Sequence, residues 1–350
     1  RRGRLPQFIM LLGLGALAGF VAAGALVPVV GVVGGLTTRS LEGFESLPVT
    51  LRTPQLAQQT VIQASDGTTF ATLYYQNRIN VRLKQVAPIM RKASIAAQDE
   101  RFIQHPGIDI RGTVRGVLST VTGQQVQGGS TITQQLVKNI LLSSAKDEAE
   151  AIAAVARTPA RKLREMRYAL ALERKFSKSK ILESYLNISY FGAGAYGVEA
   201  ASRRYFSKHA SELTLAEAAL LAGLVQQPVG YDPTRHPQAA TDRRHTVLNR
   251  MLRQGLITQA QMDNVEAKRV VDLLHPSSVP NGCTGSIAPF FCDYVMQTIR
   301  TDVSFGATLA ARDALLRQGG LVIRTTLNLR AQKAAQQAVD KAIPRTDASG

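Results

Sequence analysis

Four segments of the chain combine carboxylates, amides and basic side chains in patterns that could perform chemistry. They are AAQDERFIQHPGID (96–109), GGSTITQQLVKN (128–139), RTPARKLREM (157–166) and KSKILESYLN (178–187), and RRHTVLNRM (243–251) follows later. A carboxylate within hydrogen-bond reach can take the proton of a hydroxyl, which is a poor nucleophile near neutral pH. Arg and Lys can neutralise negative charge that develops on a phosphate group. The segments therefore contain the residue types that proton transfer and phosphate binding need.

Each segment also has a purely structural interpretation. GGSTITQQ could be a glycine turn followed by a helix with a Ser or Thr cap. Arg161 and Glu165 lie one helical turn apart and could form a surface pair, which contributes roughly a few tenths of a kcal/mol. Glu183 could cap or brace a helix, and His105, which precedes Pro106, could serve as a structural hydrogen bonder.

Several other kinds of chemistry are excluded by context. GAGAYG (192–197) matches the dinucleotide-binding fingerprint, but Glu217 falls in the first turn of a helix capped by Thr214 instead of ending a strand. SSAK (143–146) and SKSK (177–180) match the Ser-x-x-Lys of transpeptidases, yet no Lys-Thr-Gly accompanies them. The sequence has no Asp-x-Asp, and no His/Cys cluster has the spacing of a zinc site.

The charge balance predicts an anionic partner. The formal net charge is +17 and the pI is about 10.3, which favours nucleic acid, anionic lipid or a phosphorylated substrate. Aromatic residues make up 6% of the chain and Trp is absent, so the stacking platforms of single-stranded nucleic-acid binders would be scarce. We therefore expect no nucleic acid among the partners.

The N-terminal region has the pattern of a membrane anchor. Arg1, Arg2 and Arg4 precede an uncharged run from Leu5 to Thr38, which is longer than the about 20 residues that span a bilayer. The apolar core of a cleaved signal peptide would be shorter, about 7–15 residues. The positive-inside rule then puts the N-terminus in the cytoplasm and the remainder outside. An extracytoplasmic location permits a disulfide between the two cysteines, Cys283 and Cys292, although two unpaired thiols are the alternative.

The rest of the chain divides by composition. TVIQASDGTTFATLYY predicts a β-hairpin that turns at Asp66-Gly67, and the pattern from Val86 to about Arg269 is helical. The expected organisation is a cytoplasmic tail (1–6), a transmembrane anchor (7–36), a linker with the hairpin (37–80), one mainly helical domain (81–270), and a linker that leads toward a further region (271–350).

Taken together and in order, these motifs resemble the signature motifs of the family 51 peptidoglycan glycosyltransferases over about residues 60–270. GAYGVEAASRRYF and APFFCDYV look like actinobacterial members, and GGLVIRTTLNLRAQ (319–332) looks like the passage toward the transpeptidase domain of a class A penicillin-binding protein. The resemblance implies a mainly α, lysozyme-like domain. It also implies that lipid II, a lipid-linked disaccharide, is joined to a growing glycan strand with loss of undecaprenyl pyrophosphate.

The resemblance assigns roles to individual residues. The implied substrate contacts are Arg115, Ser130, Thr131, Gln135, Lys138, Asn139, Arg157, Arg161 and Lys162. Glu165 would be a second acidic site beside Arg161 and Lys162, and Glu183, Asn187 and Arg244 would be structural. No cofactor is required, although Mg²⁺ or Mn²⁺ could accompany the pyrophosphate. The implied partners are lipid II, the growing lipid-linked glycan, the cytoplasmic membrane and other cell-wall synthesis proteins.

One position departs from the family pattern. The general base of the family is a Glu four residues before the Phe of the first motif, and counting back from Phe102 leads to Gln98. An amide keeps the shape of Glu but cannot accept the proton, and losing a general base costs on the order of 10²–10⁴ in rate. Three interpretations are open: a deliberate change that traps substrate, a naturally inactive member that acts as a scaffold, or replacement of the base by Asp99 or Glu100. A lytic enzyme that cleaves glycan is a further alternative, which the basic residues disfavour.

Overall fold

The computed structural model describes residues 56–112, 129–145, 147–156 and 158–343. The transmembrane anchor predicted at 7–36 and the expected substrate contacts Arg115 and Arg157 lie outside these ranges. Within them, no helix combines the length and the apolar character that crossing a membrane requires. The predicted mainly helical fold is confirmed, and the lysozyme-like topology stays a prediction.

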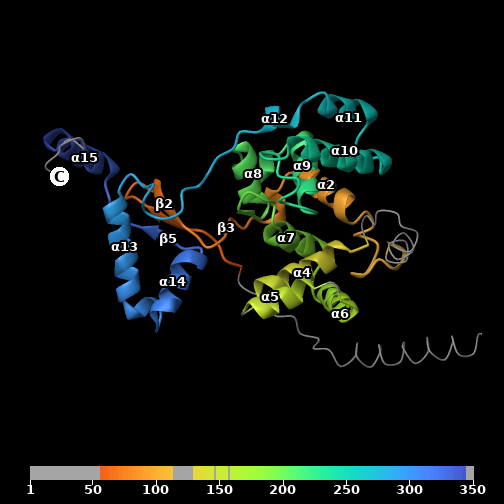
Figure 1. Ribbon diagram of the computed structural model, residues 1–350, viewed down its shortest axis with the longest axis horizontal. Coiled ribbons are helices and arrows are strands. Elements are labelled where there is room, and N and C mark those ends of the chain that lie inside the picture. Colours follow the sequence, from red (N-terminus) through yellow and green to blue (C-terminus); the bar gives the residue numbers. More distant parts are fainter. Residues whose placement is uncertain (1–55, 113–128, 146, 157, 344–350) are drawn as a thin grey trace, which may run out of the picture.

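Most of the helices gather in one lobe around a shared hydrophobic core (Figure 1). These helices are α2 (Pro88–Gln98), α4 (Ile132–Ser143), α5 (Glu148–Val155), α6 (Pro159–Lys175), α7 (Lys178–Ile188), α8 (Val198–Phe206), α9 (Leu215–Leu224), α10 (Pro237–Arg253), α11 (Gln259–Glu266) and α12 (Val270–Leu273). Short 3₁₀ turns in the described ranges are η1 (Leu83–Gln85) and η2 (Ala210–Glu212) in this lobe and η3 (Val303–Phe305), which contacts α13 and α14 outside it.

Helix α9 lies at the centre of this lobe. Its sequence, LAEAALLAGL, is apolar on nearly all sides, and every residue after Leu215 is buried, which is the pattern of a helix surrounded by others. It packs against α2 and α10. The predicted capping box is present, because the Glu217 carboxylate accepts a hydrogen bond from the Thr214 N–H at 2.8 Å. This central helix provides the surface against which the end of α2 rests.

A second, smaller hydrophobic cluster joins segments far apart in the sequence. Strands β1 (Thr60–Gln63) and β2 (Thr69–Leu73) pair antiparallel around a turn in which Gly67 has φ +85°. Strand β5 (Val322–Arg324) pairs in parallel with the other edge of β1. Helices α13 (Pro289–Thr301) and α14 (Leu309–Gln318) pack with this sheet, apart from the larger lobe (Figure 1). The sequence pattern places residues 37–80 and 271–350 in separate segments, whereas strands from both form one sheet.

A disulfide and a small sheet also link segments of the chain. Cys283 and Cys292 are joined by a disulfide with a Cα–Cα distance of 5.4 Å, and Cys292 is buried in the smaller cluster. A two-stranded sheet of β3 (Asn77–Arg78) and β4 (Ala195–Tyr196) connects the N-terminal segment to the larger lobe. Helix α15 (Leu329–Ala342) follows β5 and buries none of its residues.

Candidate active site

A polar cavity of about 300 Å³ lies where the end of α2 meets the start of α4. Both helix ends are determined locally. Helix α2 begins at Pro88, which suits the first turn of a helix, and it ends at Gln98. Helix α4 begins with a capping box between Thr131 and Gln134. The cavity is lined by Ala96, Gln98, Asp99, Glu100, Arg101, Asp109, Gly112, Gly129, Ser130, Thr131, Arg250 and Arg253.

Gln98 takes part in a chain of neutral hydrogen bonds. Its Nε2 donates to the backbone oxygen of Ala222 on α9 at 2.9 Å. Its Oε1 faces Gln135 Nε2 at 3.4 Å, and Gln135 Oε1 accepts from the hydroxyl of Tyr185 at 3.1 Å. Burial raises the pKa of Tyr185, so its hydroxyl keeps its proton and remains a donor. Each of these donors meets an acceptor, so the neighbours of position 98 accommodate a neutral amide.

Asp99 lines the cavity, but its carboxylate is engaged by hydrogen bonds within the fold. Its carboxylate accepts from His105 Nε2 at 2.9 Å and from the N–H of Ile132 at 2.9 Å. His105 Nδ1 accepts from the N–H of Gly107 at 3.1 Å, which leaves the proton of the neutral ring on Nε2. Asp99 therefore fastens the end of α2 to the start of α4, where the helix dipole favours negative charge.

Asp109 is the second carboxylate of the cavity that is already engaged. Arg101 Nη2 donates to it at 2.6 Å, and the N–H of Gly112 donates at 3.0 Å. Partial burial acts to raise the pKa of Asp109, but the hydrogen bonds from Arg101 and Gly112 outweigh it and lower the pKa below its usual value. The ion pair holds this side of the cavity in place.

Basic side chains surround a buried carboxylate beside the cavity. Glu165 on α6 is 3% exposed, and its two oxygens pair with Arg161 Nη1 and Lys162 Nζ. Lys162 Nζ also donates to the hydroxyl of Ser130 at 2.8 Å, and Ser130 lines the cavity. Lys138 stands nearby: burial lowers its pKa, the negative charge of Glu165 opposes this, and the neighbouring cations lower it further. Two cations thus pair with the Glu165 carboxylate at the edge of the cavity, and Lys138 adds a third positive charge nearby.

A family model for transglycosylases matches residues 66–252. The chain belongs to the transglycosylase family. This match, together with curated relatives that are penicillin-binding proteins, confirms the resemblance to the family 51 glycosyltransferase domain of class A penicillin-binding proteins. An actinobacterial origin stays a prediction.

The relatives are penicillin-binding proteins from several bacteria. Penicillin-binding protein 2D of Bacillus subtilis (strain 168) is 35% identical over 291 residues, which cover 83% of this chain and 39% of the relative. Penicillin-binding protein 1A of Mycobacterium tuberculosis is 36% identical over 308 residues, covering 86% of this chain and 35% of the relative. The chain thus spans well under half of each of these proteins. A crystal structure of penicillin-binding protein 1A from Haemophilus influenzae overlaps with a TM-score of 0.41 at 22% identity, covering 83% of this chain and 30% of that one.

The structure brings some of the expected transglycosylase site residues together and separates others. Gln98, Ser130 and Thr131 share the cavity, although the Thr131 hydroxyl is used in the fold, where it donates to the oxygen of Gly107 at 2.6 Å. Asn139 lies one turn beyond Gln135 on α4 and lines another cavity, of about 450 Å³. The Arg161–Glu165 pair exists as expected from its spacing, but burial of Glu165 makes it more than a surface pair.

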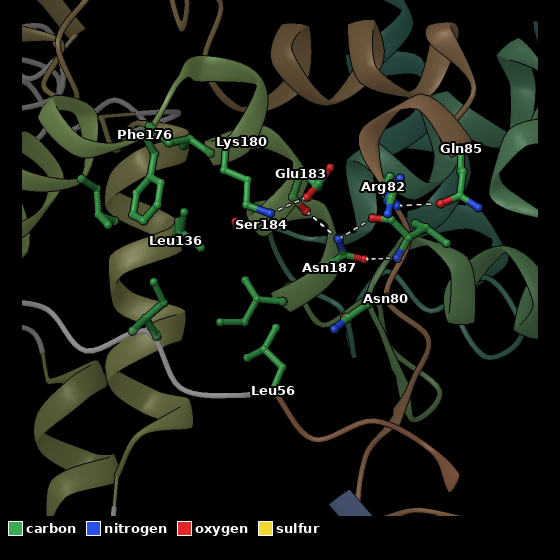
Figure 2. Close-up of a pocket in the computed structure, with 15 residues that line it drawn as sticks. Leu56, Asn80, Arg82, Gln85, Leu136, Phe176, Lys180, Glu183, Ser184 and Asn187 are labelled. Carbon is green, nitrogen blue, oxygen red and sulfur yellow. Dashed lines mark hydrogen bonds and ion pairs between the residues drawn. The ribbon is translucent and has the colours of Figure 1, made fainter. Parts of the chain in front are cut away.

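Glu183 and Asn187 form backbone hydrogen bonds away from the Gln98 cavity (Figure 2). The Glu183 carboxylate accepts from the N–H of Leu83 at 2.8 Å. The Asn187 amide accepts from the N–H of Val81 at 2.9 Å and donates to its oxygen at 2.8 Å. Both residues line a cavity of about 530 Å³ that shares no lining residue with the Gln98 cavity. Arg244 is buried and donates to the oxygen of Lys268 at 2.8 Å.

Sequence reasoning missed three contributors to the site. Ala222 and Tyr185 form the ends of the hydrogen-bond chain through Gln98, and neither residue type signals such a role. Arg250 lines the cavity and its guanidinium donates to the oxygen of Ala97 at the end of α2. It belongs to the segment 243–251, whose basic residues marked the region without singling it out.

A divalent cation has no obvious ligand set in this site. Among the residues that the structure describes, no group of three His, Cys, Asp or Glu side chains could hold a metal ion. The oxygens of Glu165 are each paired with a cation, so this carboxylate is poorly suited to a metal. Whether Mg²⁺ or Mn²⁺ accompanies a bound pyrophosphate stays an open expectation.

Proposed function

We propose that this chain is a peptidoglycan glycosyltransferase that polymerises lipid II into β-1,4-linked glycan strands with release of undecaprenyl pyrophosphate. The observation that carries the proposal is the junction of two chemically different sites. The polar Gln98 cavity meets the cluster of Lys138, Arg161 and Lys162 through the Ser130–Lys162 hydrogen bond. A hydroxyl nucleophile and a pyrophosphate leaving group need such neighbouring sites.

The basic cluster suits the leaving group. When the sugar–oxygen bond of the growing strand breaks, negative charge develops on the pyrophosphate, and fixed cations stabilise that charge in the transition state. Arg161 offers a planar fork and Lys162 a mobile ammonium, while Glu165 holds both in position. We assign substrate roles to Gln135, Lys138 and Asn139 on α4 and to Ser130, which lies just before the cap of this helix. We assign structural roles to Glu183, Asn187 and Arg244.

Gln98 lowers the rate of this reaction. The Gln98 amide cannot accept the proton of the attacking 4-hydroxyl, so we expect a rate on the order of 10²–10⁴ below that of a chain with Glu at this position. Its hydrogen bonds to Ala222 and Gln135 keep the shape of the cavity. Substrate binding is therefore retained while proton transfer is impaired.

The proposed location is the outer face of the cytoplasmic membrane. The anchor predicted at 7–36 would hold the domain beside its lipid-linked substrates, with the N-terminus inside the cell. Other cell-wall synthesis proteins are the proposed partners, and the net charge of +17 suits an anionic membrane surface.

Polymerisation of purified lipid II in detergent tests the proposal. The chain is compared with its Gln98→Glu variant, and glycan length and released undecaprenyl pyrophosphate are measured. We expect long glycan from the variant and little from the unchanged chain. Shorter fragments with anhydro ends would identify a lytic enzyme instead, and folded proteins that neither polymerise nor bind lipid II would refute the assignment.

A second candidate is a binding scaffold without catalytic activity. The complete set of neutral hydrogen bonds around Gln98 favours it, because these neighbours accommodate an amide. A scaffold would bind lipid II in both forms, and the Gln98→Glu variant would still make no polymer. The polymerisation assay therefore separates the two candidates.

A further inference from the structure

The Gln98 cavity contains carboxylates besides the missing base. Among the described residues, those that line it are Asp99, Glu100 and Asp109. Asp99 is held by His105 and Ile132, and Asp109 is held by Arg101 and Gly112. A carboxylate whose lone pairs are occupied in this way would have to break hydrogen bonds before it could receive a proton. Neither of these two is ready to act.

Glu100 differs from both. Its side chain is exposed, and within the described ranges no hydrogen bond or ion pair holds its carboxylate. Arg250, which lines the same cavity, is close enough to interact with it electrostatically. Glu100 is therefore available to a hydroxyl that enters the cavity.

The backbone explains how Gln98 and Glu100 reach the same cavity. Along a continuous helix, neighbouring side chains point about 100° apart, so side chains two positions apart would not be expected to enter the same cavity. Helix α2 ends at Gln98, however, and Asp99 leaves the helix with φ −162° and ψ 79°. Asp99 turns its side chain toward the start of α4, while Gln98 and Glu100 both line the cavity.

We propose that Glu100 is the catalytic base that remains in this chain. In the step, the Glu100 carboxylate takes the proton of the acceptor 4-hydroxyl as that oxygen forms a bond to the donor sugar carbon. The bond between this carbon and the pyrophosphate oxygen breaks, and its electron pair leaves with the pyrophosphate. Glu100 then returns its proton to water. The inference rests on the proposed glycosyltransferase function and assigns its proton transfer to a second residue.

The test compares lipid II polymerisation by the full chain and by Glu100→Gln, Gln98→Glu and the double variant. Asp293→Asn is the matched control, because it also removes one exposed carboxylate but lies on α13 in the smaller cluster. We expect a slow rate from the unchanged chain, a further loss on the order of 10²-fold in Glu100→Gln, and no loss in Asp293→Asn. In the double variant, the Glu introduced at position 98 supplies the base, so its rate should equal that of Gln98→Glu within about threefold.

The outcomes separate the two proposals. If Gln98→Glu polymerises but the unchanged chain does not, the glycosyltransferase function stands and Glu100 is no base. If Glu100→Gln is as fast as the unchanged chain, the base assignment is again overturned. If the double variant loses as much as Glu100→Gln alone, Glu100 serves binding or folding instead of proton transfer. If no folded variant polymerises, both proposals fall.

Discussion

Replacing Gln98 by Glu should destabilise the domain, even though it introduces the carboxylate that the family resemblance predicts as the base. Gln98 Nε2 donates to the oxygen of Ala222 at 2.9 Å. An ionised carboxylate has no proton to donate, so the Ala222 oxygen would lose its partner and face a negative oxygen. Leaving a buried acceptor unsatisfied costs about 1–3 kcal/mol. For a domain of this size, that corresponds to a decrease in Tm of roughly 2–12 °C.

The loss of stability in the Gln98→Glu variant should depend on pH. In the Gln98→Glu variant, a protonated carboxyl at this position could donate to the Ala222 oxygen, so folding raises its pKa above the unfolded value of about 4.3. The stabilising protonated form is fully populated below about pH 4, and the stability is lost as the pH rises through the folded-state pKa. Urea unfolding at about pH 7.5 and about pH 4.5 measures the difference, provided that the unchanged chain remains folded at both values.

A Gln98→Met variant is the matched control. It also leaves the Ala222 oxygen without a donor, but it has no titratable group, so its loss of stability should not change with pH. The reasoning is refuted if Gln98→Glu is as stable as the unchanged chain at about pH 7.5, or if its deficit is the same at both pH values.

Two further predictions concern the basic cluster and the disulfide. Glu165→Gln should lower the free energy of unfolding by about 1–3 kcal/mol, less than the about 3–5 kcal/mol of a fully buried pair, because Arg161 and Lys162 are 17% and 31% exposed and solvent compensates part of the loss. Added inorganic pyrophosphate should recover stability in this variant more than in the unchanged chain in a thermal unfolding assay, and an equal response would contradict the arrangement. The double variant Cys283→Ser/Cys292→Ser lacks the disulfide that closes a loop in the unfolded chain. Its free energy of unfolding should therefore be lower by about 2–3 kcal/mol, as measured by urea unfolding of the smaller cluster. A control that reduces the unchanged chain should give the same loss, and no loss in either case would argue against a structural role.

Local sequence patterns were sufficient for several elements. The capping box predicted at Thr214 depends on side chains three residues apart, and it forms. The Ser- or Thr-capped helix suggested for GGSTITQQ is also present, with Thr131 as its cap. The almost entirely apolar pattern of 215–224 matches its position at the centre of the lobe. The order of the motifs was sufficient to recognise the family. In each case the signal lies within a few residues or in the linear order of segments, so it can be read without knowing the fold.

The tertiary structure decided which side chains of the site are free. The sequence shows Gln98, Asp99 and Glu100 as three consecutive polar residues, and nothing in that order separates their roles. Their roles differ because α2 ends there, beside the start of α4 and the packed helix α9. Gln98 donates to the oxygen of Ala222, which is 124 residues away, and Asp99 accepts from the N–H of Ile132. Glu100 remains exposed to the cavity. The i, i+4 spacing of Arg161 and Glu165 predicts only a surface pair, whereas the fold buries Glu165 within a cluster of charged side chains. Hydrogen-bond partners and desolvation come from segments distant in the chain, so only the folded structure can decide which of these groups can exchange a proton.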